Sequence, residues 1–149
     1  MKLTDHFDLD ELTASQTADR LGLDNTPTPE VIANLTALCV HVLEPLREAL
    51  GQVLISSGYR SPAVNAAIGS GPTSQHVEGR AADLSVKGRS LDEVFNWLLA
   101  HEPVDQVIRE FPPGGWVHVS HDPARHRRQG LMAIKVDGKV VYRAQGPLA

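Results

Sequence analysis

The longest helical pattern of apolar residues lies in the first third of the chain. Its members repeat every three or four positions: Val31, Leu35, Leu38, Val42 and Leu46. This spacing puts the side chains on one face of a helix. Thr28 followed by Pro29 is typical of a helix start, because proline at the first helical position gives up no backbone hydrogen bond. We predict a helix from there to Gly51, kinked or broken near residues 42–44, because Pro45 has no N–H for the preceding turn.

Residues 1–27 show the features of shorter helices. Two pairs have the three-residue spacing of a capping box: Asp8 with Glu11, and Thr13 with Gln16. In such a box each side chain bonds the backbone of the other residue. Gly22 is a residue type that commonly ends a helix. We therefore expect a helical lead-in over residues 1–27 and the core of a single domain over residues 28–149.

Beyond residue 52 the pattern changes to short apolar runs between turn residues, which indicates strands. The predicted strands are residues 53–56, 81–86, 106–111, 116–120, 133–136 and 139–142. We expect the first of them to be buried. Asp137-Gly138 separates the last two and favours a two-residue hairpin turn. Because helices come early and strands cluster late, we predict an α+β fold with a mostly antiparallel sheet packed with helices.

Two of these strands alternate between apolar residues and one polar residue of unusual type. In residues 116–120 the valines share one face and His118 lies on the other, while in residues 81–86 Asp83 faces away from the apolar side chains. If the two strands are neighbours, these polar side chains meet across a cleft, and His76 can reach them from the preceding loop. Alone, each has an ordinary explanation as a hydrogen-bonded residue. Together, two imidazoles and one carboxylate form a ligand set suited to a catalytic zinc site. Such a site uses three protein ligands and keeps a fourth position for water.

Composition removes several classes of function. The chain has 149 residues and a net charge of −4, with one short basic cluster at residues 125–128, so we expect no nucleic-acid partner. Its single cysteine, Cys39, excludes an internal disulfide. No apolar run approaches the roughly 20 residues of a membrane span, and the first residues lack the apolar segment of a signal peptide. We expect a monomer, synthesised in the cytoplasm without a signal peptide.

Three segments resemble one known family. They are Ser74-x-His76-x-x-Gly79-x-Ala81-x-Asp83, the preceding Ser57-Gly58-Tyr59-Arg60-Ser61, and Trp116-Val117-His118. This pattern is similar to the M15 zinc peptidases, which include D-Ala-D-Ala carboxypeptidases and peptidoglycan endopeptidases such as phage endolysins. The resemblance runs from about residue 3 to residue 134. It implies a Hedgehog/D,D-peptidase type of fold, zinc held by His76, Asp83 and His118, and cleavage of peptidoglycan stem peptides. The small size of the chain points to the phage endolysin-like branch.

The resemblance also implies roles for Arg60 and Ser74. In the family, the arginine of the Ser-Gly-Tyr-Arg turn binds the substrate or polarises its carbonyl, and a guanidinium suits a carboxylate or an oxyanion. We predict that Arg60 is both catalytic and substrate-binding; the alternative is an arginine that pairs with an acidic neighbour. Ser74 is placed with the substrate-binding residues. It either hydrogen-bonds the groups around the metal or caps its own loop.

The general base departs from the family pattern. Many M15 enzymes have a carboxylate three residues before the last histidine ligand, and Gly115 occupies that position here. We predict that Glu110 replaces it, because a hairpin through the Pro-Pro-Gly-Gly turn would return its side chain to the ligand strand. Asp105 is the second candidate. Three further polar residues are expected at the surface: Glu78, His121 and His126.

The predicted function is hydrolysis of a peptide bond in a peptidoglycan stem peptide, by a carboxypeptidase or an endopeptidase. Such an enzyme would act on the cell wall in the periplasm after its release, or would be associated with a virion. Two alternatives remain from the sequence: a non-enzymatic, zinc-containing binding domain of the Hedgehog type, and a phage structural component.

Overall fold

The computed structural model describes residues 1–101 and 103–149. Its main sheet has six strands in the order β3-β4-β6-β5-β7-β8. Their bounds are β3 (Val53–Ser57), β4 (Ala81–Val86), β5 (Gln106–Glu110), β6 (Trp116–Ser120), β7 (Gln129–Val136) and β8 (Lys139–Ala144). Four of the five neighbouring pairs in this sheet are antiparallel, and β5 with β7 is parallel. The predicted α+β class is confirmed, with a mixed sheet in which antiparallel pairs predominate.

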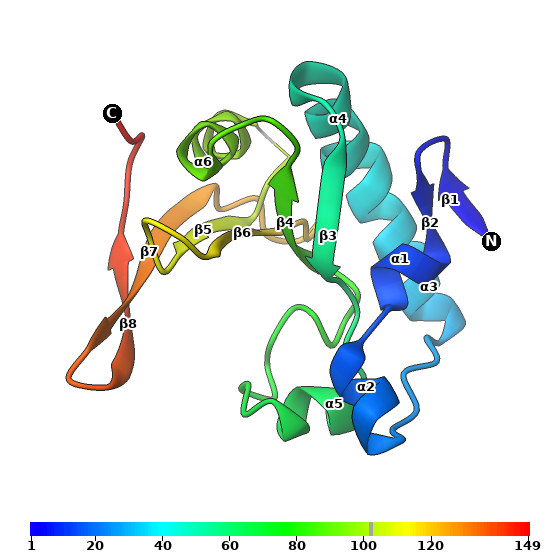
Figure 1. Cartoon of the computed structure of the whole chain (residues 1–149). Helices are drawn as coiled ribbons and strands as arrows, with labels where there is room; N and C mark the ends of the chain where they lie inside the picture. The colour runs from blue at the N-terminus through cyan, green and yellow to red at the C-terminus, as the bar shows by residue number, and fades with distance from the viewer. Residues whose placement is uncertain (102) are drawn as a thin grey trace.

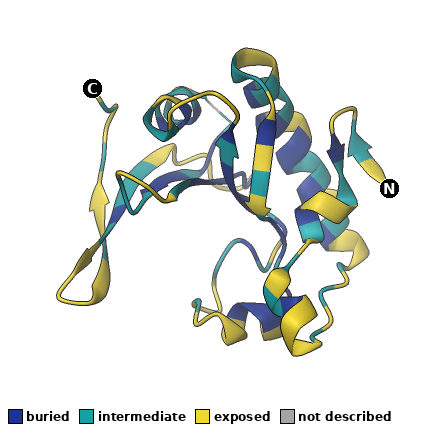
Figure 2. Cartoon of the chain, viewed as in Figure 1, coloured by how far each residue is buried: buried dark blue, intermediate teal, exposed yellow. Residues whose placement is uncertain are grey.

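The helical elements gather around this sheet (Figure 1). They are α1 (Leu9–Thr13), α2 (Gln16–Leu21), α3 (Pro29–Leu38), the π-helix η1 (Cys39–Leu43), α4 (Glu44–Leu50), α5 (Pro62–Ala67) and α6 (Leu91–Ala100). The core lies between the sheet and two helical elements (Figure 2). One is the long helix made of α3, η1 and α4, and the other is α6. Within the part of the chain that the structure describes, no helix is long and apolar enough to cross a membrane.

The prediction of a helical lead-in was only partly right. A hairpin of β1 (Lys2–Thr4) and β2 (Phe7–Asp8) precedes the two short helices, because Phe7 is buried against the core and needs an extended chain to reach it. The capping box of Asp8 and Glu11 is present at the start of α1. The second predicted box is not: Ser15 caps α2, whereas the Thr13 hydroxyl donates to the carbonyl of Leu9.

The long helix is interrupted at the place that Pro45 predicts. In the π-helix η1 the backbone hydrogen bonds join residues five positions apart instead of four. The N–H of Glu44, for example, donates to the carbonyl of Cys39. The carbonyl of His41, which an ordinary residue 45 would have bonded, pairs instead with Nε2 of His101 at 2.7 Å. The interruption therefore leaves this backbone acceptor satisfied, and the apolar face continues into the core.

The sheet has one apolar face and one polar face. Ala82, Leu84 and Val86 of β4 and Val117 and Val119 of β6 join the core. Alternation along the strands then turns their polar neighbours to the opposite, open face, as the sequence predicts. The strand at residues 53–57 is an exception to the expectation of burial. It is the edge strand β3, whose burial alternates along its length, and Leu54 is 46% exposed.

The turn between β5 and β6 is held by two unusual residues. Arg109 is buried on the core side; its guanidinium donates to the carbonyls of Gly114 at 2.7 Å and Pro113 at 3.0 Å, and its Nε donates to Asp92 at 3.0 Å. Gly115 has a φ of +74°, and a Cβ there would lie 1.8 Å from the carbonyl oxygen of Glu110. The turn therefore requires glycine at residue 115.

We predict that Gly115→Ala lowers the free energy of unfolding by about 2–4 kcal/mol, from the left-handed conformation and the backbone clash combined. Gly114→Ala is the matched control, since a Cβ at Gly114 meets nothing within 4 Å. That variant should stay within about 0.5–1 kcal/mol of the original protein. Urea unfolding followed by circular dichroism measures both; equal stability of the two variants would contradict the prediction.

Candidate metal centre

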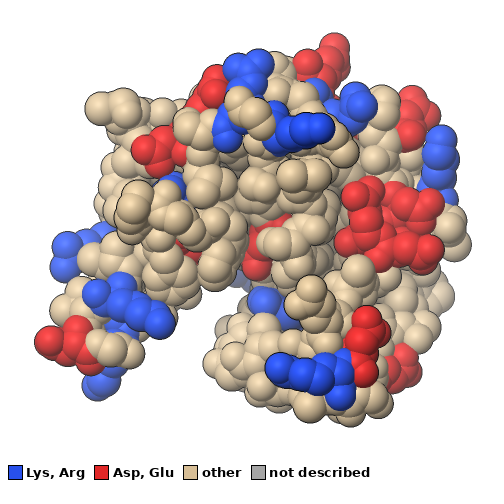
Figure 3. All heavy atoms as spheres, viewed as in Figure 1, with Lys and Arg blue, Asp and Glu red and all other residues tan. Residues whose placement is uncertain are grey.

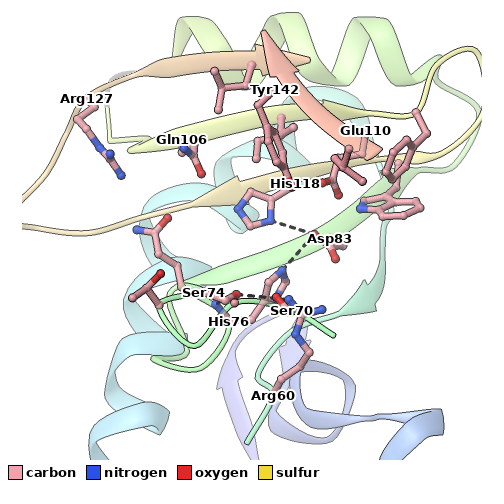
Figure 4. Close-up of a pocket in the computed structure, with 18 of the residues that line it drawn as sticks. Arg60, Ser70, Ser74, His76, Asp83, Gln106, Glu110, His118, Arg127 and Tyr142 are labelled. Carbon is pink, nitrogen blue, oxygen red and sulfur yellow. Dashed lines mark hydrogen bonds and ion pairs between the residues drawn. The ribbon is translucent and has the colours of Figure 1, made fainter. Parts of the chain in front are cut away.

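Three buried polar side chains converge on the open face of the sheet (Figure 4). Asp83 on β4 pairs in register with His118 on β6, and His76 reaches them from the loop before β4. Oδ1 of Asp83 lies 3.2 Å from Nε2 of His76 and 3.0 Å from Nδ1 of His118. One ligand atom from each residue lies within 4.8 Å of the other two. The sequence prediction that these residues meet is therefore correct.

The loop that carries His76 is fixed from both sides. The N–H of Arg60 donates to the His76 carbonyl at 3.1 Å, and Asn34 on α3 donates to the carbonyl of Glu78 at 2.9 Å. Gly79 has a φ of +73°, and a Cβ there would lie 2.8 Å from the Val31 side chain. Glycine thus lets the loop turn sharply while it presses against α3.

The surroundings of His76 and Asp83 favour the forms of these two side chains that bind a metal. The His76 ring has Nδ1 2.6 Å from the carbonyl of Gly58, so Nδ1 carries the proton and the lone pair of Nε2 faces Asp83. Burial lowers the pKa of His76, which favours the neutral ring. Burial opposes ionisation of Asp83, but the two neighbouring imidazoles of His76 and His118 outweigh it and hold the pKa of Asp83 well below its usual value.

The two separations between Asp83 Oδ1 and the histidine nitrogens also fit a small tetrahedral ion. Two ligands, each about 2.0–2.1 Å from zinc at the tetrahedral angle, are about 3.3 Å apart. The separations of 3.2 and 3.0 Å around Asp83 Oδ1 are close to this value. Two imidazoles and one carboxylate are also the donor set of a catalytic site, in which a fourth position stays open. The three residues therefore fit a catalytic metal.

The cluster opens into a cleft of about 830 Å³. Figure 3 shows the surface hollowed on this side, between the β7–β8 hairpin and the region of α5. Arg60, Ser74 and Glu110, the other residues that the sequence singles out, all line the cleft. The structure therefore brings all six predicted site residues to one cavity.

Glu110 occupies the strand next to His118. Ile108 of β5 pairs with His118, and Glu110 pairs with Trp116, so Glu110 lies on the same face two residues further along. Burial, and then the negative charge of Asp83, raise the pKa of Glu110 above its usual value. The indole of Trp116 acts in the opposite direction, although its buried N–H forms no hydrogen bond within the described residues.

Arg60 lies on the opposite wall of the cleft (Figure 4). Its Nη2 donates to the hydroxyl of Ser74 over a long 3.4 Å, and its Nε is buried with no hydrogen-bond partner in the described part of the chain. Burial lowers the pKa of Arg60, while the charges of Asp83 and Glu110 raise it. These contacts favour an arginine held ready for a ligand over one that is committed to a neighbouring carboxylate.

Asp105, the second candidate for the general base, has partners that occupy its carboxylate. Asp105 is fully buried. Its carboxylate accepts hydrogen bonds from Nε and Nη2 of Arg127 at 2.7 and 2.8 Å, and from the side-chain amide of Gln75 at 2.9 Å. Burial opposes its ionisation, but these partners dominate and lower the pKa of Asp105. Its role is to join the loop of His76 to the far side of the cleft.

The remaining polar candidates lie apart from the cluster. Glu78 is exposed, as expected. His121 is not at the surface: it is 5% exposed, its Nδ1 donates to the carbonyl of Pro103 at 2.7 Å, and its ring stacks between those of His41 and His126. The expectation for His121 was wrong because its burial depends on segments far away in the chain.

Sequence reasoning missed several residues of the cleft, most of them beyond β6. These are Gln75, Gln106, Phe111, Trp116, Arg125, Arg127, Leu131, Val140 and Tyr142. The alternation of the final hairpin would have assigned Val140 and Tyr142 to one face. It does not tell which strand the hairpin joins.

Comparison with known proteins agrees with this geometry. Residues 5–120 match the family model described as Peptidase M15, a segment that includes the three clustered residues, Arg60 and Glu110. No curated protein matches the chain. The match covers well over half of the 149 residues and ends at the last residue of β6. The chain belongs to the peptidase M15 family, whose members are metal-dependent peptidases.

Proposed function

We propose that the protein is a zinc-dependent peptidase that hydrolyses peptide bonds in the stem peptides of bacterial peptidoglycan. One observation carries the proposal: a buried His-Asp-His cluster opens into a cleft that has a carboxylate, Glu110, on one wall and a cation, Arg60, on the other. A domain that only bound a partner would have no need of both groups at the metal. Their presence favours an enzyme over a binding domain of the Hedgehog type.

The proposed ligand atoms are Nε2 of His76, Oδ1 of Asp83 and Nδ1 of His118. Zinc is the expected ion because it accepts both imidazole and carboxylate in a site with an open position. When bound, such an ion polarises a carbonyl oxygen and lowers the pKa of water. The hydrogen bond from His76 to Gly58 orients one ligand before the ion arrives.

Glu110 is the proposed general base. Its carboxylate takes a proton from the attacking water and returns it to the nitrogen of the leaving amine. Burial raises the pKa of Glu110, so the carboxylate binds that proton more readily than an exposed glutamate would. The usual family position for this group, residue 115, has no room for a side chain. A neighbouring strand supplies the carboxylate instead.

Arg60 is proposed to stabilise negative charge that develops on the substrate carbonyl oxygen, or to hold a substrate carboxylate. Because its guanidinium is partly buried, the attraction between that positive charge and a negative charge on the substrate is stronger in the low dielectric of the cleft wall. Ser74 accepts a hydrogen bond from the Arg60 guanidinium and so helps to orient it. Arg60 and Ser74 both lie on the wall opposite Glu110 (Figure 4). We propose that the peptide lies between this wall and Glu110.

The substrate class comes from the family resemblance, and the cleft is consistent with it. Its volume of about 830 Å³ lies in the upper part of the range for ligand sites, about 300–1,000 Å³. We further propose one peptidase domain of the Hedgehog/D,D-peptidase type over the whole chain, of the endolysin-like branch, acting on the cell wall.

We predict that a chelator abolishes cleavage of purified peptidoglycan and that added zinc restores it. Without the ion, His76, Asp83 and His118 cannot polarise the substrate carbonyl or lower the pKa of the water. Mass spectrometry of the released muropeptides reports activity, metal dependence and the bond that is cut. Cleavage that continues in metal-free protein would contradict a metallopeptidase.

We predict that His118→Ala loses both stoichiometric zinc and activity, because one of three ligands is gone. Elemental analysis after dialysis measures the bound metal. His126→Ala is the control, since His126 is exposed, stacks on His121 and is not among the residues that line the cleft. One zinc per chain in the His118→Ala protein would disprove the ligand set.

We predict that Glu110→Gln keeps zinc but lowers kcat by about 10²–10⁴-fold, because the amide cannot take up the proton of the water. Glu78→Gln, the same change at an exposed position of the neighbouring loop, should leave kcat unaltered. Zinc content and turnover are measured on the same preparations. Normal turnover in Glu110→Gln would mean that another group is the base.

A further inference from the structure

The β7–β8 hairpin is a wall of the cleft that the family match does not include. The match ends at residue 120, whereas the hairpin covers residues 129–144. It extends the sheet by pairing β7 with β5 in parallel, and projects beyond the rest of the sheet (Figure 1). Leu131, Val140 and Tyr142 of this hairpin line the cleft. The hairpin therefore adds a surface to the site that the matched segment does not supply.

The sheet register brings Tyr142 close to the proposed base. Glu110 pairs with Ala133 of β7, and Ala133 pairs with Tyr142 of β8, so the three residues form one row on one face. Ala133 is fully buried, and its small side chain leaves space above it for a ring from the next strand. Figure 4 shows Tyr142 directed from β8 into the opening that Glu110 and His118 share.

Packing does not account for this tyrosine. Tyr142 is 55% exposed, and Val140 beside it on the same face is 44% exposed, so neither belongs to the core. Partial burial, and then the charges of Glu110 and Asp83, raise the pKa of Tyr142. The hydroxyl is therefore protonated at neutral pH and available as a hydrogen-bond donor. The Glu110 carboxylate in the same row would repel a negatively charged acceptor. A neutral carbonyl oxygen is therefore the acceptor that suits this hydroxyl best.

We propose that Tyr142 is a substrate-contacting residue, whose hydroxyl donates a hydrogen bond to a backbone carbonyl of the stem peptide beside the scissile bond. Its ring, with Val140, forms the apolar wall against which the peptide lies. The inference rests on the proposed peptidase function and adds a specificity element from outside the family match. Because the contact is to the peptide and not to the metal, its loss affects substrate binding more than the chemical step.

The test compares Tyr142→Phe, Tyr142→Ala and a control, Arg143→Ala, the neighbouring exposed residue on the other face of β8. Kinetics are measured on a stem peptide that the original protein cleaves. Removing one neutral hydrogen bond should raise KM about 3–10-fold in Tyr142→Phe, with kcat within about twofold. Tyr142→Ala should lower kcat/KM about 10–100-fold, since the ring is lost as well. Arg143→Ala should behave as the original protein. Zinc content and the unfolding midpoint should be unchanged in all three.

A second measurement does not depend on turnover. Calorimetric binding of the same peptide to zinc-loaded Glu110→Gln protein, with and without Tyr142→Phe, should show affinity weakened by about 3–10-fold. Unchanged KM and affinity in both tyrosine variants, or an equal loss in Arg143→Ala, would overturn the role of Tyr142 while leaving the peptidase function intact. An original protein that neither cleaves nor binds any stem peptide would overturn the proposed function and this inference together.

Discussion

The pairing of β4 with β6 is the constraint on which the site depends. It sets Asp83 directly opposite His118 on the open face, while the valines of β6 and the apolar residues of β4 fill the core behind them. A slip of one residue would turn the carboxylate into the core and an apolar side chain into the cleft. The hydrophobic packing that stabilises the fold therefore also specifies the position of two of the three proposed ligands.

The proposed base depends on a different device, the turn from β5 to β6. Arg109 is fully enclosed on the core side and holds the carbonyls of that turn, while Gly115 lets the backbone pass within contact distance of Glu110. The same close approach leaves no space for a side chain at residue 115. The proposed base Glu110 instead reaches the cleft from β5, while the usual family position is closed to a side chain for a steric reason.

The cleft is assembled from two separate parts of the chain. Arg60 and the loop of His76 form one wall, and the strands after residue 105 form the other, with Asp105 joining the two through Gln75 and Arg127. The parallel addition of β7 carries the final hairpin to the side of Glu110. A segment distant in sequence from the ligands thereby supplies the wall that contains Tyr142.

The sequence by itself determined the features that rest on local spacing. Strand alternation and the Ser-x-His-x-x-Gly-x-Ala-x-Asp pattern identified the three clustered residues, and Pro45 located the interruption of the long helix. These succeeded because periodicity and backbone chemistry act over a few residues. They gave no account of the β1–β2 hairpin or of the exposure of the edge strand β3, which depend on what lies beside each segment.

The sequence placed Glu110 before Asp105 as the proposed base, and only the tertiary structure shows how their surroundings differ. Both are carboxylates near β5, but Asp105 meets Arg127 and Gln75, whereas Glu110 has a free path to the cleft. The same holds for the burial of His121 and for the place of Tyr142. The burial of His121, for example, depends on its contact with Pro103, 18 positions away. Local patterns do not encode such contacts, because the pairing order of the strands decides them.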